Sequence, residues 1–226
     1  MTALPRRLAG RKRKIAEFES FQQVIDTLIA TVNDHDTYTG GHSRRVADFV
    51  THLARLMDLH PHQIALSRQA GFVHDVGKIG IPDKILKKKE PLTDEEFHLI
   101  RLHPILGASI LSRMPGMEAI IPIVLHHHER WDGGGYPSGL AGTDIPLEAR
   151  IIFVADAFDA MTTDRPYGRV LSTEEALAEV REGADGQFDP SVAVAMQEAF
   201  GLGLLEDGPE AAPVPAPDLA RYSLAL

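Results

Sequence analysis

The sequence of 226 residues contains no cysteine. This absence excludes disulfide bonds, zinc sites with thiolate ligands, iron–sulfur clusters and cysteine nucleophiles. Eleven histidines are present instead. A metal site in this chain would therefore use imidazole nitrogen and carboxylate oxygen as its ligands.

Long apolar stretches are also lacking. The longest ones, such as Ile120–Leu125 and Ile151–Ala155, fall far short of the about 20 residues that a membrane-spanning helix needs. The basic amino-terminal segment is not followed by the apolar core of a secretory signal. We therefore expect a cytoplasmic protein without a transmembrane segment.

Basic charge is scarce outside the first 14 residues. The formal net charge is −9, but residues 1–14 hold six basic residues and no acidic one. The remaining chain, with 17 basic and 32 acidic residues, carries −15. Because phosphate attraction dominates non-specific binding to DNA and RNA, a nucleic-acid polymer is not an expected partner. A smaller phosphate-bearing substrate would need cations gathered at one place.

Helical periodicity dominates the chain. Apolar residues recur at three- and four-residue steps over residues 18–32 and 46–57, which is typical of amphipathic helices. Apolar spacing, capping residues and prolines predict further helices. Three cover residues 61–74, 93–101 and 147–163, and the others begin at His103, end at the His126–His128 run, follow Ser172 and begin at Asp189. Alternating strand patterns are absent. The predicted fold is therefore an all-α helical bundle.

The length favours one domain with modest extensions. We divide the chain into a basic amino-terminal segment (1–14), a folded domain (15–205) and a proline-rich flexible tail (206–226). Residues 76–92 and 130–146 are rich in glycine, proline and charge and are expected to be loops. The apolar helix 18–32 is a candidate surface for pairing with a second copy of the chain.

Histidine and carboxylate residues recur at predicted helix ends and on core-facing helices. The set comprises His42, His74, Asp75, His103, His126–His128 and Asp156. No pair forms a local chelate such as HExxH, and a single histidine is more often a core or surface residue than a ligand. A helical bundle can nevertheless bring such residues to one point, as bundle-core metal sites do.

Five segments resemble the HD-GYP family of cyclic di-GMP phosphodiesterases in order and spacing. They are DTYTGGHSRRV (36–46), HDVGKIGIPDKIL (74–86), LTDEEFHLIRLHPILGASIL (92–111), HHERWDGGGYPSGL (127–140) and ARIIFVADAFDAMTTDRPY (149–167). The resemblance covers about residues 20–200. It implies an all-helical HD-domain fold with a binuclear metal site, usually iron or manganese. It also implies hydrolysis of cyclic di-GMP to linear pGpG, sometimes on to GMP.

The resemblance further implies the ligands of two divalent metal ions. One metal would be held by His42, His74, Asp75 and Asp156, and Asp75 would bridge to a second metal held by His103, His127 and His128. Two bridged cations acidify a water between them to hydroxide, which attacks phosphorus in line. We interpret His126 as structural. Tyr38 stands where some members have a glutamate that recruits a third metal, so two metals are predicted.

Other residues are expected to act on the substrate. Lys78 and Arg165 are candidates for binding its phosphates, and Asp159 for orienting a metal ligand or water. The resemblance implies that Gly135, Tyr136 and Pro137 shape the substrate site, and that their loop can contact diguanylate cyclase (GGDEF) domains. Lys87–Glu90 and Gly168 depart from the family pattern and affect the expected substrate affinity more than the metal centre.

Two alternatives stay open. One is an HD phosphohydrolase for another nucleotide, such as a hybrid cyclic dinucleotide, because base contacts are not readable from one sequence. The other is a catalytically weak module whose Gly-Tyr-Pro loop recruits a partner protein. Substitution of His74 and Asp75 separates enzyme from interaction module, because only the enzyme loses every activity.

Overall fold

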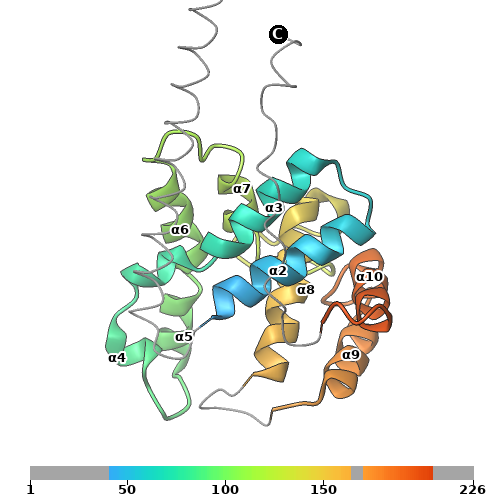
Figure 1. Ribbon diagram of the computed structural model, residues 1–226. Helices are drawn as coiled ribbons and strands as arrows, with labels where there is room; N and C mark the ends of the chain where they lie inside the picture. Colours follow the sequence, from blue (N-terminus) through green and yellow to red (C-terminus); the bar gives the residue numbers. More distant parts are fainter. Residues whose placement is uncertain (1–40, 164–169, 206–226) are drawn as a thin grey trace, which may run out of the picture.

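A computed structural model describes residues 41–163 and 170–205. Helices joined by turns and loops make up these ranges (Figure 1), with one isolated β-bridge between Ala184 and Phe188. The predicted all-α class is confirmed. No helix in these ranges has both the length and the apolar character needed to cross a membrane. The predicted helix 18–32, the basic segment and the tail lie outside the described residues.

The helices follow one another with short connections. Their bounds are α2 (His42–Leu56), α3 (Pro61–Val73), η1 (Val76–Gly80), α4 (Asp83–Leu86), α5 (Asp94–Ile100), α6 (His103–Leu111), α7 (Ile121–Leu125), η2 (Gly142–Asp144), α8 (Leu147–Thr162), α9 (Thr173–Glu182) and α10 (Pro190–Gly201). η1 and η2 are short 3₁₀ turns.

Several helices begin at the predicted capping residues. Thr93 accepts a hydrogen bond from the backbone N–H of Glu96, whose side chain accepts from the N–H of Thr93, and Ser172 and Glu175 form the same capping box at α9. Asp189 caps α10 directly before a proline. These starts confirm the sequence prediction, because a cap is a local interaction between residues close in the chain.

The core lies where α2, α3 and α8 pack together. Val50 and Leu53 of α2 and Ile151 of α8 are fully buried there. In Figure 1, α9 and α10 lie on one side of α2 and α8, whereas η1, α4, α5 and α6 lie on the other. The amino-terminal end of α2 consequently faces the segment that contains His74 and Asp75.

The segment 76–92 is more regular than the predicted loop, since it contains η1 and α4. Both are too short to show a hydrophobic period. η1 packs closely on α6 at Gly77, where an added Cβ would lie 1.9 Å from the carbonyl oxygen of His103 and 2.5 Å from the backbone nitrogen of Gly107. Glycine is therefore required at this crossing.

Candidate metal centre

Two groups of histidine and aspartate side chains gather at the end of the bundle core. One contains His42, His74 and Asp156, and the other contains Asp75, His103, His127 and His128; within each group the candidate ligand atoms lie within 4.8 Å of one another. We call them the first and the second cluster. They are the seven residues that the family resemblance implied as metal ligands.

Helix ends position most of these residues. His42 opens α2, directly after Gly41 with its positive φ of 97°. His74 directly follows α3, and His103 opens α6. His127 follows α7, whereas Asp156 lies within α8. Because helix ends can converge at one point, residues far apart in the sequence meet there.

Three buried imidazoles are oriented in the same way. The Nδ1 atoms of His74, His103 and His127 lie 2.8, 2.7 and 2.6 Å from the backbone carbonyl oxygens of Gly71, Ile100 and Val124. A carbonyl oxygen only accepts, so each Nδ1 donates and carries the ring proton. Each Nε2 is then left with an unprotonated lone pair, the form that binds a metal.

The lone pairs face one another in a way that fits bound cations. Nε2 of His103 lies 3.2 Å from Nε2 of His127. Nε2 of His74 is buried and has no hydrogen-bond partner among the described residues. Two facing acceptors repel unless a cation lies near both, so these imidazoles would suit a shared cation.

Asp75 connects the two clusters. Its Oδ2 lies 3.4 Å from Nε2 of His74 and 3.8 Å from Nε2 of His42. Its Oδ1 lies 3.3 Å from Nε2 of His103. One carboxylate oxygen thus faces each cluster, which is the arrangement that a bridging ligand requires.

Charge and burial favour the metal-binding protonation states. Burial and the neighbouring imidazoles hold the pKa of His127 and His128 well below the ordinary value, so both are neutral at neutral pH. Burial raises the pKa of Asp75, but Lys78 and His74 outweigh it and hold that pKa well below the ordinary value. Burial lowers the pKa of His74, but Asp75 and Asp156 outweigh burial and raise it. The carboxylates of Asp75 and Asp156 thus favour positive charge at His74, and a bound cation would supply such charge.

Asp159 lies behind His42 rather than among the candidate ligands. Its buried carboxylate accepts a hydrogen bond from Nδ1 of His42 at 2.7 Å and from Nε of Arg45 at 2.5 Å. On the other side of the ring, Nε2 of His42 lies 3.3 Å from Asp156. Asp159 is therefore placed to orient His42 and fix its tautomer, not to act on a substrate directly.

The predicted phosphate-binding residues differ in what the structure describes. Nζ of Lys78 lies 2.6 Å from Oδ2 of Asp75, so this ammonium group stands at the centre. Arg165, like Tyr38 and Gly168, lies outside the described residues.

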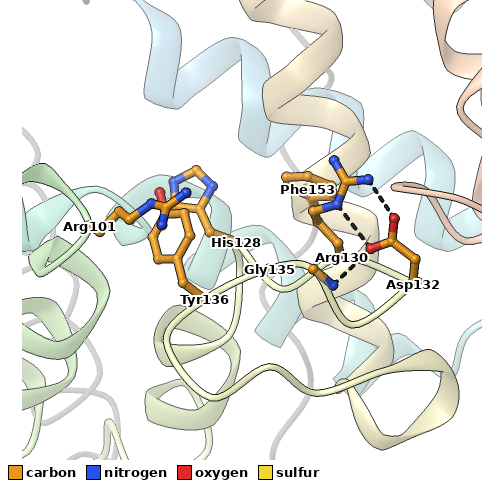
Figure 2. Close-up of a pocket in the computed structure, with 8 residues that line it drawn as sticks. Arg101, His128, Arg130, Asp132, Gly135, Tyr136 and Phe153 are labelled. Atoms are coloured by element: carbon orange, nitrogen blue, oxygen red, sulfur yellow. Dashed lines mark hydrogen bonds and ion pairs between the residues drawn. The ribbon is translucent and has the colours of Figure 1, made fainter. Parts of the chain in front are cut away.

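The Gly-Tyr-Pro loop folds back over the second cluster. A Cβ at Gly135 would lie 2.3 Å from the backbone nitrogen of Arg130, so the loop passes over the preceding chain without a side chain. The ring of Tyr136 stacks on His128 at 5.0 Å, and partly buried Pro137 follows it. A pocket of about 340 Å³ adjoins this stack (Figure 2).

Sequence reasoning missed Glu129. Its carboxylate is only 1% exposed and accepts hydrogen bonds from the backbone N–H groups of Ser138, at 2.7 Å, and Leu140, at 3.2 Å. Nδ1 of His126 lies 3.4 Å from the same carboxylate, which fits the structural role predicted for His126. Glutamate is rarely buried, and its position directly after the histidine run was the only signal.

Arg101 was also missed. Its guanidinium carbon lies 4.7 Å from the ring centre of Phe97 and 5.2 Å from that of Tyr136. Its contact with Tyr136 joins segments far apart in the chain, so no local pattern singles out this exposed residue at the end of α5.

Comparison with known proteins identifies the family. The HD-domain family model matches residues 26–192. A cyclic di-GMP phosphodiesterase of Pseudomonas aeruginosa is 43% identical over 168 residues, which are 74% of this chain and 40% of that protein. A 3'3'-cGAMP-specific phosphodiesterase of Vibrio cholerae is 32% identical over 185 residues, which are 81% of this chain and 40% of that protein.

A solved structure supports the fold. The crystal structure of a cyclic GMP-AMP-specific phosphodiesterase of Vibrio cholerae matches with a TM-score of 0.65 at 18% identity, covering 88% of this chain and 52% of the other. The chain thus spans about two fifths of the two curated relatives named above. By its matched residues, its helical fold and its paired clusters, the chain belongs to the HD-domain family, in the HD-GYP branch.

Proposed function

We propose that this chain is a metal-dependent phosphodiesterase that hydrolyses a cyclic dinucleotide, with cyclic di-GMP as its substrate. The observation that carries the proposal is the position of Asp75, whose two oxygens face two imidazole clusters. The relatives named as cyclic di-GMP phosphodiesterases support the choice of substrate.

The proposed cofactor is a pair of divalent cations, iron or manganese. His42, His74 and Asp156 would hold one cation, His103, His127 and His128 the other, and Asp75 both. When bound, such a pair lowers the pKa of water and neutralises charge on phosphoryl oxygens. The nitrogen and oxygen donors of this set suit either metal.

The side chains around the clusters support this reaction. Hydrolysis adds water to one phosphorus, breaks its bond to the 3′ oxygen, and leaves a 3′ hydroxyl and a 5′ phosphate. Lys78 brings positive charge to the point where a phosphate would meet Asp75. Asp159 keeps His42 oriented. The acidic chain can therefore bind an anionic dinucleotide, because its cations are concentrated locally.

The test uses chain loaded anaerobically with iron or manganese. We expect conversion of cyclic di-GMP to pGpG, measured by chromatography, and a fall of about 1,000-fold or more in Asp75→Asn, which loses the bridging charge. Asp83→Asn is the matched control, because Asp83 is exposed, pairs with Lys87 and belongs to neither cluster. A protein with both metals bound that turns over no cyclic dinucleotide would refute the proposal and favour the interaction module.

A second candidate substrate is 3'3'-cGAMP. Relatives named as specific for it are 32% to 36% identical to this chain, close to the range of the cyclic di-GMP enzymes. The two substrates are separated by their kcat/KM values with the same metal-loaded preparation.

A further inference from the structure

The pocket beside the second cluster is a separate compartment of the site. Figure 2 shows Arg101, Tyr136 and His128 at one end, and Arg130 and Asp132 at the other. Its volume of about 340 Å³ is at the lower end of the range for ligand pockets, about 300–1,000 Å³. It therefore suits one part of a dinucleotide, such as a base. His128 both lines this pocket and belongs to the second cluster, so the rest of the dinucleotide would lie at the metal clusters.

The far end of this pocket is fixed by internal pairing. Arg130 donates from Nε to Asp132 at 3.0 Å and from a terminal nitrogen to Gln187 at 3.1 Å. The pairing with Arg130 and the backbone N–H of Gly134 lowers the pKa of Asp132 to about 2. Most donors of Arg130 are thus committed to neighbouring residues.

Arg101 differs from Arg130 in this respect. Within the described ranges its guanidinium has ring contacts with Phe97 and Tyr136 but no hydrogen bond or ion pair to a carboxylate. Contact with aromatic rings holds a guanidinium in place while its N–H groups stay available at the edge. Arg101 is consequently the cation in this pocket whose N–H groups are available to bind a ligand.

We propose that the pocket is the subsite for one guanine base of the substrate, and that Arg101 selects guanine by donating two hydrogen bonds to O6 and N7. The inference rests on the proposed function and adds a base preference to it. Arginine pairs with the O6 and N7 acceptors of guanine in this way in protein–DNA complexes. Adenine carries an amino group in place of O6, so one of the two hydrogen bonds would become a contact between donors.

The lining of the pocket favours a base over a phosphate. Phe153 lies in its wall, and aromatic side chains stack on bases, whereas the ring of Tyr136 is covered by His128 and Arg101 and serves to hold that arginine. A phosphate would gain nothing from the Phe153 ring, and Lys78 already supplies a cation at the clusters.

The first experiment compares cyclic di-GMP with cyclic di-AMP. We expect the manganese-loaded chain to prefer cyclic di-GMP in kcat/KM by roughly 10- to 100-fold, the discrimination given by one bidentate arginine. Arg101→Met should bring this ratio close to one, mainly by raising the KM for cyclic di-GMP. Arg113→Met, an exposed arginine beyond α6, is the matched control and should keep the ratio. An equal loss for both substrates would mean that Arg101 binds phosphate and would overturn the proposal.

The second experiment uses 3'3'-cGAMP, which has a single guanine. If that guanine occupies the pocket, only one of the two phosphodiester bonds lies at the metal clusters. The wild-type chain should then yield one linear isomer in excess, and Arg101→Met a nearly equal mixture, resolved by chromatography. Equal isomers from an active wild-type chain would overturn the guanine subsite and leave the phosphodiesterase function intact.

Binding gives a readout that does not depend on turnover. GMP and AMP can be titrated into the chain by calorimetry, with and without manganese. Preference for GMP that is lost in Arg101→Met supports the subsite even if catalysis fails, whereas equal affinity in the wild-type chain refutes it.

Discussion

At the scale of single residues, Glu129 holds the Gly-Tyr-Pro loop in place. Its buried carboxylate accepts hydrogen bonds from two loop N–H groups, those of Ser138 and Leu140. The loop between Glu129 and Ser138 includes Tyr136, which stacks on His128. A residue that touches no substrate therefore determines where the aromatic wall of the pocket lies.

Glu129→Ala should destabilise the folded chain by about 1–3 kcal/mol, because two loop N–H groups lose their acceptor and a buried site is left empty. It should also raise the KM for the cyclic dinucleotide more than it lowers kcat. Urea unfolding and steady-state kinetics measure the two effects.

Glu129→Gln is the informative comparison, since its amide keeps one acceptor oxygen and should recover part of the stability and of the KM. Glu198→Ala, at an exposed position of α10, is the control. Wild-type stability and KM in Glu129→Ala would contradict the anchoring role.

At the scale of helices, Asp189 joins α10 to α8. One of its oxygens accepts hydrogen bonds from the backbone N–H of Ser191 at 2.8 Å and from its hydroxyl at 2.6 Å. The other oxygen pairs with Arg150 of α8. Helix capping and an interhelix ion pair thus depend on the same carboxylate.

Acid should weaken this junction. Burial raises the pKa of Asp189, but Ser191 and Arg150 outweigh it and lower that pKa below the ordinary 3.8. The carboxylate then stabilises the fold above pH 3.8, and this contribution is lost as the pH falls through the lower folded-state value. Asp189→Asn should lose about 1 kcal/mol at neutral pH and show a flatter pH dependence of unfolding below pH 4. Parallel stability curves for the two proteins in that range would argue against it.

At the scale of the whole molecule, the two clusters join three helices, α2, α6 and α8, and the segments that follow α3 and α7. An unfolded chain cannot present these ligands together, so bound metal stabilises the folded state. Manganese at about 100 times its dissociation constant should add about 2.7 kcal/mol, seen as a higher Tm that a chelator reverses.

His127→Ala should reduce this increase in Tm, and His62→Ala, on the exposed side of α3, should keep it. A wild-type Tm that is indifferent to manganese, iron and chelator would count against the metal centre.

Much of this molecule is predictable from its sequence. Helix starts such as those at Thr93 and Asp189 are local, and the resemblance to the HD-GYP family implies all seven residues that the structure gathers in the two clusters. Glu129 and Arg101 escaped prediction because their roles depend on tertiary contacts, a buried loop for one and an aromatic ring for the other. The elements η1 and α4 were not predicted, because they are too short to show a hydrophobic period.

The crossing at Gly77 has a consequence for metal stoichiometry. Here the main chain of η1 touches the main chain of α6, two residues after Asp75 and at His103 itself. The span between the two clusters is thus set by backbone contact, which side-chain rotation cannot adjust. In Gly77→Ala the added methyl group would force the two segments apart, and Asp75 could then reach only one cluster. We expect that variant, if folded, to bind one metal ion per chain instead of two, measured by elemental analysis.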